Sequence, residues 1–216
     1  MSRVGAIPAR AAPALVEEAF ELAGRRVSLL RPPSADELID EAAFDEDEFL
    51  PYWAELWPSG VALAQAVAAL DLRGRRVLEL GCGLGLPSLA AALRGAEVLA
   101  TDWAADAVRL LRRNAERNGV ALRAERVRWD EPEPLLREAP WDLVLGADLL
   151  YERRNAEQLE RLLPRLGPEA LLADPGRPFA GGFLERIRCS FRVRSRRGAE
   201  QPAVTLHRLS APGGDT

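Results

Sequence analysis

Three evenly spaced glycines follow a short apolar run and carry the clearest chemical signal in this sequence. The run VLEL at 77–80 contains one acid, Glu79, and leads into Gly81, Gly83 and Gly85. A strand, a glycine turn and a helix in this order form a nucleotide-binding corner, because backbone N–H groups at the helix start can face a ligand. Glycine has no Cβ, so the turn can approach that ligand closely.

The position of the last glycine separates two kinds of nucleotide. A dinucleotide site has the pattern G-x-G-x-x-G, and here Leu86 stands where the third glycine of that pattern belongs. Glu79 lies at the end of the run, where a carboxylate would repel a pyrophosphate and attract a cation. S-adenosylmethionine (SAM) has no phosphate and carries a sulfonium and an ammonium group. The pattern therefore favours SAM.

Polar residues also follow the next predicted strands. Asp102 lies twenty-one residues after Gly81, at the place where an acid can accept both ribose hydroxyls of an adenosine. Its alternative role is to cap the following helix. Trp129 can pack on an adenine ring and Asp130 can accept from the adenine amino group. The alternative for Asp130 is an ordinary turn acid before Pro132.

Aromatic residues are concentrated just before the glycine corner, in PYWAELWPSG at 51–60. Tyr52, Trp53 and Trp57 occur within six residues. Such a cluster is often part of a hydrophobic core, but aromatic faces also suit an adenine ring or a cationic amine. We therefore expect Trp53 and Trp57 to flank the cofactor or the amine.

Strands and helices alternate from residue 76 onward. We expect strands at 76–80, 97–101, 122–127, 142–147, 169–173, 190–196 and 203–209, and helices at 59–70, 86–94, 104–118, 132–138, 153–164 and 178–188, with the fifth helix ending at Pro164. This alternation predicts an α/β fold, a Rossmann-like doubly wound sheet of seven mostly parallel strands. The last two strands have no helix between them, so the last strand should be antiparallel.

The chain divides into a small N-terminal extension, 1–50, and a main domain, 51–216. The extension should contain a short hairpin around Ala23 and Gly24. An acidic helix should follow, with Ser34 as N-cap and Glu37 completing a capping box. Eight acids at 36–48 form either a solvated surface or a patch that attracts a basic protein substrate.

Composition sets broad limits on the function. The chain has 216 residues, 48% hydrophobic and 29% charged, with a formal net charge of -4, as in an ordinary soluble domain. Two cysteines, Cys82 and Cys189, are too few for a disulfide framework and suit a reducing cytoplasm. No signal peptide, membrane-spanning run or Cys/His metal cluster is recognisable. We expect a cytoplasmic protein with no metal and no membrane partner.

Several motifs together resemble the seven-β-strand SAM-dependent methyltransferases. These are VLELGCGLG, Asp102, WDEP at 129–132 and DLVLGADLLY at 142–151. PYWAELWPSG, the Asp-x-x-Tyr at 148–151 and DPGR at 174–177 resemble the protein-lysine methyltransferase branch. The resemblance implies SAM as cofactor, S-adenosyl-L-homocysteine as product and a protein substrate that presents a lysine. It also implies that Asp148 orients the amine and that Tyr151 walls its channel.

The predicted site is therefore as follows. The catalytic residues are Asp148 and Tyr151, and the cofactor-binding residues are Trp57, Glu79, Gly81, Cys82, Gly83, Leu84, Gly85, Asp102, Trp103, Trp129, Asp130 and Ala147. A lysine amine has a pKa of about 10.4, so it must lose a proton before it attacks. Asp148 could help remove that proton through water. We expect the protein to be a monomer.

Three other functions are compatible with parts of the sequence. Arginines near the end, at 186–197, would suit an RNA methyltransferase, although they also suit a charged edge strand. A small-molecule N-methyltransferase acting on a pyridine or an amine would need a closed pocket. A protein could also hold SAM without turnover. Asp-Leu-Leu-Tyr at 148–151 lacks the prolines of Asn/Asp-Pro-Pro-Tyr, which argues against base amines and glutamine amides as substrates.

Overall fold

A computed structural model describes residues 14–35, 38 and 51–213. The hairpin predicted around Ala23 and Gly24 is present, and both turn residues have positive φ, +53° and +73°. This pair of left-handed residues suits a tight two-residue turn between twisted strands. The predicted acidic helix and all eight acids at 36–48 lie outside the described residues.

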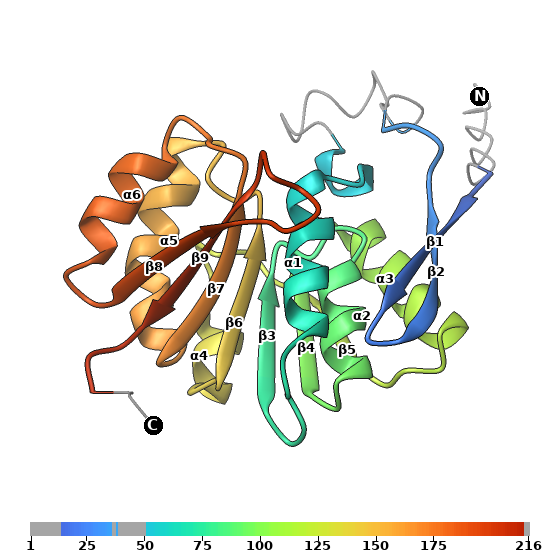
Figure 1. Cartoon of the computed structure of the whole chain (residues 1–216), viewed down its shortest axis with the longest axis horizontal. Helices are drawn as coiled ribbons and strands as arrows, with labels where there is room; N and C mark the ends of the chain where they lie inside the picture. The colour runs from blue at the N-terminus through green and yellow to red at the C-terminus, as the bar shows by residue number, and fades with distance from the viewer. Residues whose placement is uncertain (1–13, 36–37, 39–50, 214–216) are drawn as a thin grey trace, which may run out of the picture.

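The segment 51–213 contains a seven-stranded sheet with helices between most of its strands (Figure 1). The elements are β1 (Val16–Leu22), β2 (Arg25–Arg31), the 3-10 helix η2 (Tyr52–Ala54), α1 (Pro58–Ala68), β3 (Arg76–Leu80), α2 (Leu86–Leu93), β4 (Glu97–Asp102), α3 (Ala105–Arg117), β5 (Arg123–Arg126), α4 (Glu133–Glu138), β6 (Leu143–Ala147), α5 (Arg153–Leu166), β7 (Glu169–Asp174), α6 (Ala180–Ile187), β8 (Arg192–Arg197) and β9 (Thr205–Ser210).

The strand order is β5-β4-β3-β6-β7-β9-β8. The first five of these strands are parallel, and β9 is antiparallel to both β7 and β8. The predicted fold class, a doubly wound sheet with an antiparallel last strand, is confirmed. The insertion of β9 between β7 and β8 was not predicted, because no local pattern reports which strand a segment joins.

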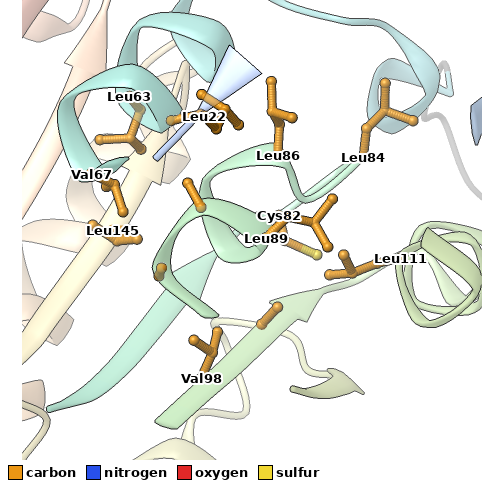
Figure 2. Packing of buried hydrophobic residues seen from close by; sticks show 14 of the residues in the cluster. Leu22, Leu63, Val67, Cys82, Leu84, Leu86, Leu89, Val98, Leu111 and Leu145 are labelled. Atoms are coloured by element: carbon orange, nitrogen blue, oxygen red, sulfur yellow. The ribbon is translucent and has the colours of Figure 1, made fainter. Parts of the chain in front are cut away.

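Two layers of helices cover the sheet. Apolar side chains of α1, α2 and α3 pack on one face, and those of α4, α5 and α6 pack on the other. Figure 2 shows part of the first layer, where Leu63 and Val67 of α1 lie near Leu145 of β6, and Leu86 and Leu89 of α2 belong to the same cluster. Both faces of the central strands are therefore buried, which explains why these strands read as nearly continuous apolar runs.

Several predicted boundaries differ from the observed ones by one or two residues, and at the end of α5 the predicted stop signal itself was wrong. Helix α5 continues through Pro164 to Leu166 instead of ending at the proline. A proline in the last turn removes one N–H donor, but Leu162, Leu163 and Leu166 are all buried against the sheet. Burial of three leucines outweighs the loss of one hydrogen bond.

The N-terminal hairpin is attached to α3 through two asparagines. Asn114 accepts from the backbone N–H of Leu30 at 2.8 Å and donates to its carbonyl at 3.0 Å. Asn118, one turn later, makes the same pair of bonds with Ser28, at 2.8 and 2.7 Å. The two amides thus bond the backbone N–H and C=O groups at the edge of β2 that a third strand would otherwise bond.

Chain order places a switch point between β3 and β6. From β3 the chain proceeds outward to β4 and β5, and then returns to the other side of β3 as β6. Helices that leave adjacent strands in opposite directions open a crevice at the strands' carboxyl ends. The glycine turn after β3 and the loop after β6 both lie there.

Candidate active site

A cavity at the carboxyl ends of the parallel strands contains the whole predicted site. Its lining includes Trp57, Glu79, Gly81, Cys82, Gly83, Leu84, Gly85, Asp102, Trp103, Trp129, Asp130, Ala147, Asp148 and Tyr151. The structure thus brings all fourteen residues together from five separate stretches of the chain. The individual roles assigned to them remain predictions.

The glycine turn adopts a backbone that other residues rarely take. Gly81, Gly83 and Gly85 have φ of +59°, +50° and +74°. A Cβ on Gly85 would lie 2.3 Å from a methyl carbon of Leu111, and one on Gly83 would lie 3.1 Å from the carbonyl oxygen of Trp53. The glycines are therefore required by the turn and by its packing on α3 and η2, in addition to any closeness to a ligand.

Asp102 joins the end of β4 to this turn. Its Oδ2 accepts from the backbone N–H of Gly83 and its Oδ1 from that of Ala104, each at 2.9 Å. Ala104, and not Asp102, is the N-cap of α3, so the predicted alternative role as a helix cap was wrong. Each carboxylate oxygen keeps a further lone pair that can accept from a hydroxyl.

Glu79 was predicted to carry a negative charge, but its surroundings favour the protonated form at neutral pH. The side chain is buried at 1% exposure, and the Ser88 hydroxyl of α2 donates to its Oε2. Burial raises the pKa of the carboxyl to about 8, against the smaller opposing effect of Ser88. At neutral pH the group is mostly protonated, so the prediction of a full negative charge beside the turn is corrected. A cation placed nearby would favour its ionisation.

The tryptophan and acid of WDEP lie on another wall of the cavity. The Trp129 ring approaches the turn, 3.6 Å from where a Cβ on Gly81 would lie. Asp130 is half exposed and paired with Arg128 through two contacts of 3.1 Å. Arg128 lowers the pKa of the Asp130 carboxyl, which therefore carries its charge at neutral pH.

Asp148 has the least ordinary backbone in the site. Its φ is +59°, and among the described residues only Ala23 shares a positive φ without being glycine. Its N–H donates to the carbonyl of Ala173 at 2.8 Å, which ties the loop after β6 to β7. The side chain is 5% exposed. A left-handed residue with a buried carboxylate is a strained feature of the kind that functional sites retain.

The Asp148 carboxylate is held by Arg177. The arginine donates from Nε to Oδ1 at 2.6 Å and from an Nη to Oδ2 at 3.1 Å, a two-point pair. Asp148 in turn raises the pKa of the Arg177 guanidinium. The sequence motif DPGR contains this arginine, but nothing local in the sequence indicates its partner, which lies 29 positions away.

The turn in DPGR explains how Arg177 reaches that carboxylate. Asp174, at the end of β7, accepts with Oδ1 from the N–H of Gly176 at 2.7 Å and from that of Arg177 at 2.9 Å. Gly176 has φ of +94°, which reverses the chain toward the loop after β6. Pro175 limits the remaining freedom. Each residue of the motif thus helps to place one guanidinium.

Three aromatic rings follow one another along the cavity and end beside Arg177, the partner of Asp148. The ring centroid of Tyr52 lies 5.8 Å from that of Tyr151 and 6.3 Å from that of Trp57, both edge to face. The Trp57 indole donates to the carbonyl of Tyr52 at 2.9 Å, and the Arg177 guanidinium lies 5.5 Å from the Trp57 ring. Such rings suit a cationic or alkyl amine.

Further residues complete the cavity. Arg154, Asn155 and Gln158 of α5 line it, and none was singled out from the sequence. They lie on α5, where the sequence pattern indicates which leucines are buried but not which polar residues face the cavity. Burial raises the pKa of Tyr151, so its phenol stays neutral at physiological pH. Within 14–35, 38 and 51–213 no helix is long and apolar enough to cross a membrane, and no group of three or more His, Cys, Asp or Glu could hold a metal.

Comparisons with known proteins identify the family. A family model described as lysine methyltransferase matches residues 43–171. The electron transfer flavoprotein β subunit lysine methyltransferase of Xenopus laevis is 37% identical over 139 residues, which are 59% of this chain and 53% of that protein. Protein N-lysine methyltransferase METTL21A of Danio rerio is 34% identical over 120 residues, 52% of this chain and 55% of that protein. The chain spans about half the length of these relatives.

A solved structure supports the same fold. The T. thermophilus 16S rRNA methyltransferase RsmC, in complex with AdoMet and guanosine, matches 92% of this chain and 51% of its own, with a TM-score of 0.65 and 20% identity. At this identity the likeness concerns the fold alone. The family model, by contrast, covers more than half of the sequence. This chain therefore belongs to the lysine methyltransferase family, whose enzymes are SAM-dependent methyltransferases with a Rossmann-like fold.

Proposed function

We propose that this protein transfers a methyl group from SAM to a lysine side chain of a protein. The observation that carries the proposal is the position of Asp148, a buried carboxylate next to three aromatic rings at the edge of the cavity that also contains the glycine turn. Family membership supports an amine acceptor. Because several relatives are named for the electron transfer flavoprotein β subunit, we propose this protein as the first substrate to test.

The residues of the cavity fit SAM. Asp102 has lone pairs left for two ribose hydroxyls after its bonds to the backbone. Trp129 offers a ring face for adenine, and Asp130 a charged acceptor for the adenine amino group. The backbone of Gly81 to Gly85 can face the methionine part of the molecule. The buried Glu79 can ionise when a cation arrives, which would favour a sulfonium compound.

The chemistry of the acceptor side follows from these positions. SAM supplies an electrophilic methyl group when bound. Asp148 would hold the lysine nitrogen and orient its lone pair toward that methyl, while Tyr52, Trp57 and Tyr151 would exclude water around the alkyl chain. The amine must first lose its proton, because a free lysine has a pKa of about 10.4. The aromatic wall lowers that pKa by desolvation, which favours the neutral amine.

The rival substrates receive less support. The arginines of β8 lie on the edge strand of the sheet, and none of them lines the cavity. They suit a charged edge that resists pairing with another sheet. RNA is therefore the weaker proposal. A small amine would fit the same carboxylate, so it must be separated from a protein substrate by experiment.

The test uses SAM with an isotopically labelled methyl group. Purified protein is incubated with the electron transfer flavoprotein β subunit from the same organism, with total RNA and with a metabolite extract in parallel. We expect label on a lysine of the β subunit, located by mass spectrometry, and none with Asp148→Asn. Label only in the RNA or metabolite reaction would overturn the proposal.

A further inference from the structure

The guanidinium of Arg177 occupies both oxygens of the carboxylate that is proposed to hold the substrate amine. Asp148 is the carboxylate proposed to hold the substrate nitrogen, and both of its oxygens already accept from Arg177. The guanidinium also lies over Trp57, one of the rings proposed to surround the substrate side chain. A cation, a carboxylate and an aromatic face are therefore already assembled, with the cation supplied by the protein.

Exposure indicates which partner can move. The Arg177 side chain is 33% exposed, whereas that of Asp148 is 5% exposed. The Arg177 guanidinium contacts two residues of the cavity wall, Asp148 and Trp57. Its head group thus covers the carboxylate at the edge of the cavity. The carboxylate is fixed by the strained loop after β6, while a long arginine side chain at the surface can swing into water at moderate cost.

We propose that Arg177 is a resident cation that holds the Asp148 carboxylate in the free enzyme and is displaced by the substrate lysine. The proposal rests on the proposed function, because it takes Asp148 as the acceptor site. Arg177 is then a specificity residue: it keeps a buried carboxylate paired when no substrate is present. A substrate amine can therefore bind only if its other contacts offset the loss of the Arg177–Asp148 ion pair.

The sequence offers an unusual test, because the chain contains no lysine. The variant Arg177→Lys puts a primary amine on the same stem, within reach of the same carboxylate. If the head group at position 177 lies in the acceptor position, this variant should methylate itself. The amine nitrogen would form a bond to the methyl carbon, the S–CH3 bond would break with its electron pair going to sulfur, and the nitrogen would release a proton to water. The products are methylated lysine and S-adenosyl-L-homocysteine.

The experiment follows the mass of the intact variant, carrying a lysine-free tag, in the presence of SAM. We expect a gain of one to three methyl groups on the introduced lysine, with a rate that does not depend on protein concentration, as for an intramolecular reaction. The matched control is Arg186→Lys, because Arg186 is also ion-paired, to Glu160 at 2.6 Å, but this partner does not line the cavity, whereas Asp148 does. That variant should remain unmodified.

A second variant checks the displacement itself. Arg177→Gln removes the cation that competes with the substrate lysine for the Asp148 carboxylate. The KM for the protein substrate should therefore fall by on the order of tenfold. The kcat should change less than the KM. A purely structural role for Arg177 predicts the opposite, a higher KM with a lower kcat.

Failure of this inference can be told from failure of the proposed function. If Arg177→Lys binds SAM by calorimetry but gains no methyl group, the inference is overturned, whatever the wild type does. If wild-type protein methylates the β subunit while Arg177→Gln raises the KM, the function stands and the displacement is wrong. If Arg177→Lys methylates itself but no protein substrate is labelled, the inference stands and the choice of substrate fails.

Discussion

The carboxylate of Asp102 accepts a hydrogen bond of 2.9 Å from the backbone N–H of Gly83. This bond connects the carboxyl end of β4 to the turn that follows β3, so one acid both shapes the glycine turn and faces the cavity. Loss of the carboxylate should therefore affect the cofactor through two routes, a missing acceptor for the ribose and a less ordered turn.

We expect Asp102→Ala to weaken SAM binding by about 10- to 100-fold, because bonds to a charged acceptor contribute about 1.5–3 kcal/mol each. Isothermal titration calorimetry measures this directly. Asp102→Asn keeps one acceptor oxygen and should lose less. An unchanged affinity in the alanine variant would refute the ribose role.

Asp148→Asn should have a different profile from Asp102→Ala. The amide keeps the size of the side chain but cannot hold an ammonium, so methyl transfer should fall by at least about 100-fold. SAM affinity should stay within about threefold, since the assigned cofactor contacts lie elsewhere. Single-turnover transfer and calorimetry on the same preparation separate the two effects. Transfer at the wild-type rate would exclude Asp148 as the group that positions the amine.

Cofactor binding should be coupled to proton release by Glu79. The pKa of this carboxyl is raised to about 8, so the free protein holds a proton there at pH 7. A sulfonium nearby favours the ionised form and lowers that pKa. SAM affinity should therefore increase as the pH rises toward about 8 and level off above it. Calorimetry in buffers of different ionisation enthalpy detects the released proton.

The matched control for this coupling is Glu79→Gln, which keeps an acceptor for Ser88 but cannot ionise. Its SAM affinity should not rise with pH over the same range. The same variant should also be more stable than wild type at alkaline pH. The folded-state pKa lies above the unfolded value of 4.5, so wild-type protein loses stability as the pH rises between these values.

Gly85→Ala should destabilise the protein by more than about 2 kcal/mol, because it combines a positive φ with a clash against Leu111. Gly181→Ala is the control. Gly181 lies in α6 with open space around its Cβ position, so alanine there should stabilise by about 0.5–1 kcal/mol. Urea unfolding measures both. Equal stability of the two variants would contradict this account of the turn.

Asn114→Ala should cost about 2–4 kcal/mol of stability, because it leaves the N–H and the carbonyl of Leu30 without partners in a buried position. Asn118→Ala should cost less, since its bonds to Ser28 lie in a partly exposed position where water can replace the amide. Thermal unfolding of both variants tests the order. A smaller loss of stability for Asn114→Ala than for Asn118→Ala would contradict this prediction.

Most of the fold was readable from the sequence because the strands are short apolar runs separated by amphipathic helices. Periodicity identifies such elements, and their alternation implies parallel strands. The prediction that α5 ends at Pro164 was wrong because it used only the local propensity of proline. The burial of three leucines, which the local sequence does not report, decides where the helix ends. The place of β9 depends on long-range pairing, which no window of sequence reports.

The site was predictable to a similar degree. Residues at or just after the ends of strands, such as Asp102 and Asp148, could be placed, because strand ends meet at one edge of a parallel sheet. The charge of Glu79 could not, since it depends on burial under α2. The pairing of Arg177 with Asp148 also escaped prediction, because it joins loops after two different strands.

The attachment of the hairpin by Asn114 and Asn118 has a consequence for the order of assembly. The bonded residues are 84 and 90 positions apart. As the chain leaves the ribosome, β1 and β2 emerge long before the helix that receives them. The hairpin is thus synthesised before the helix that receives it, and Leu30 and Ser28 have no asparagine partners until α3 has formed.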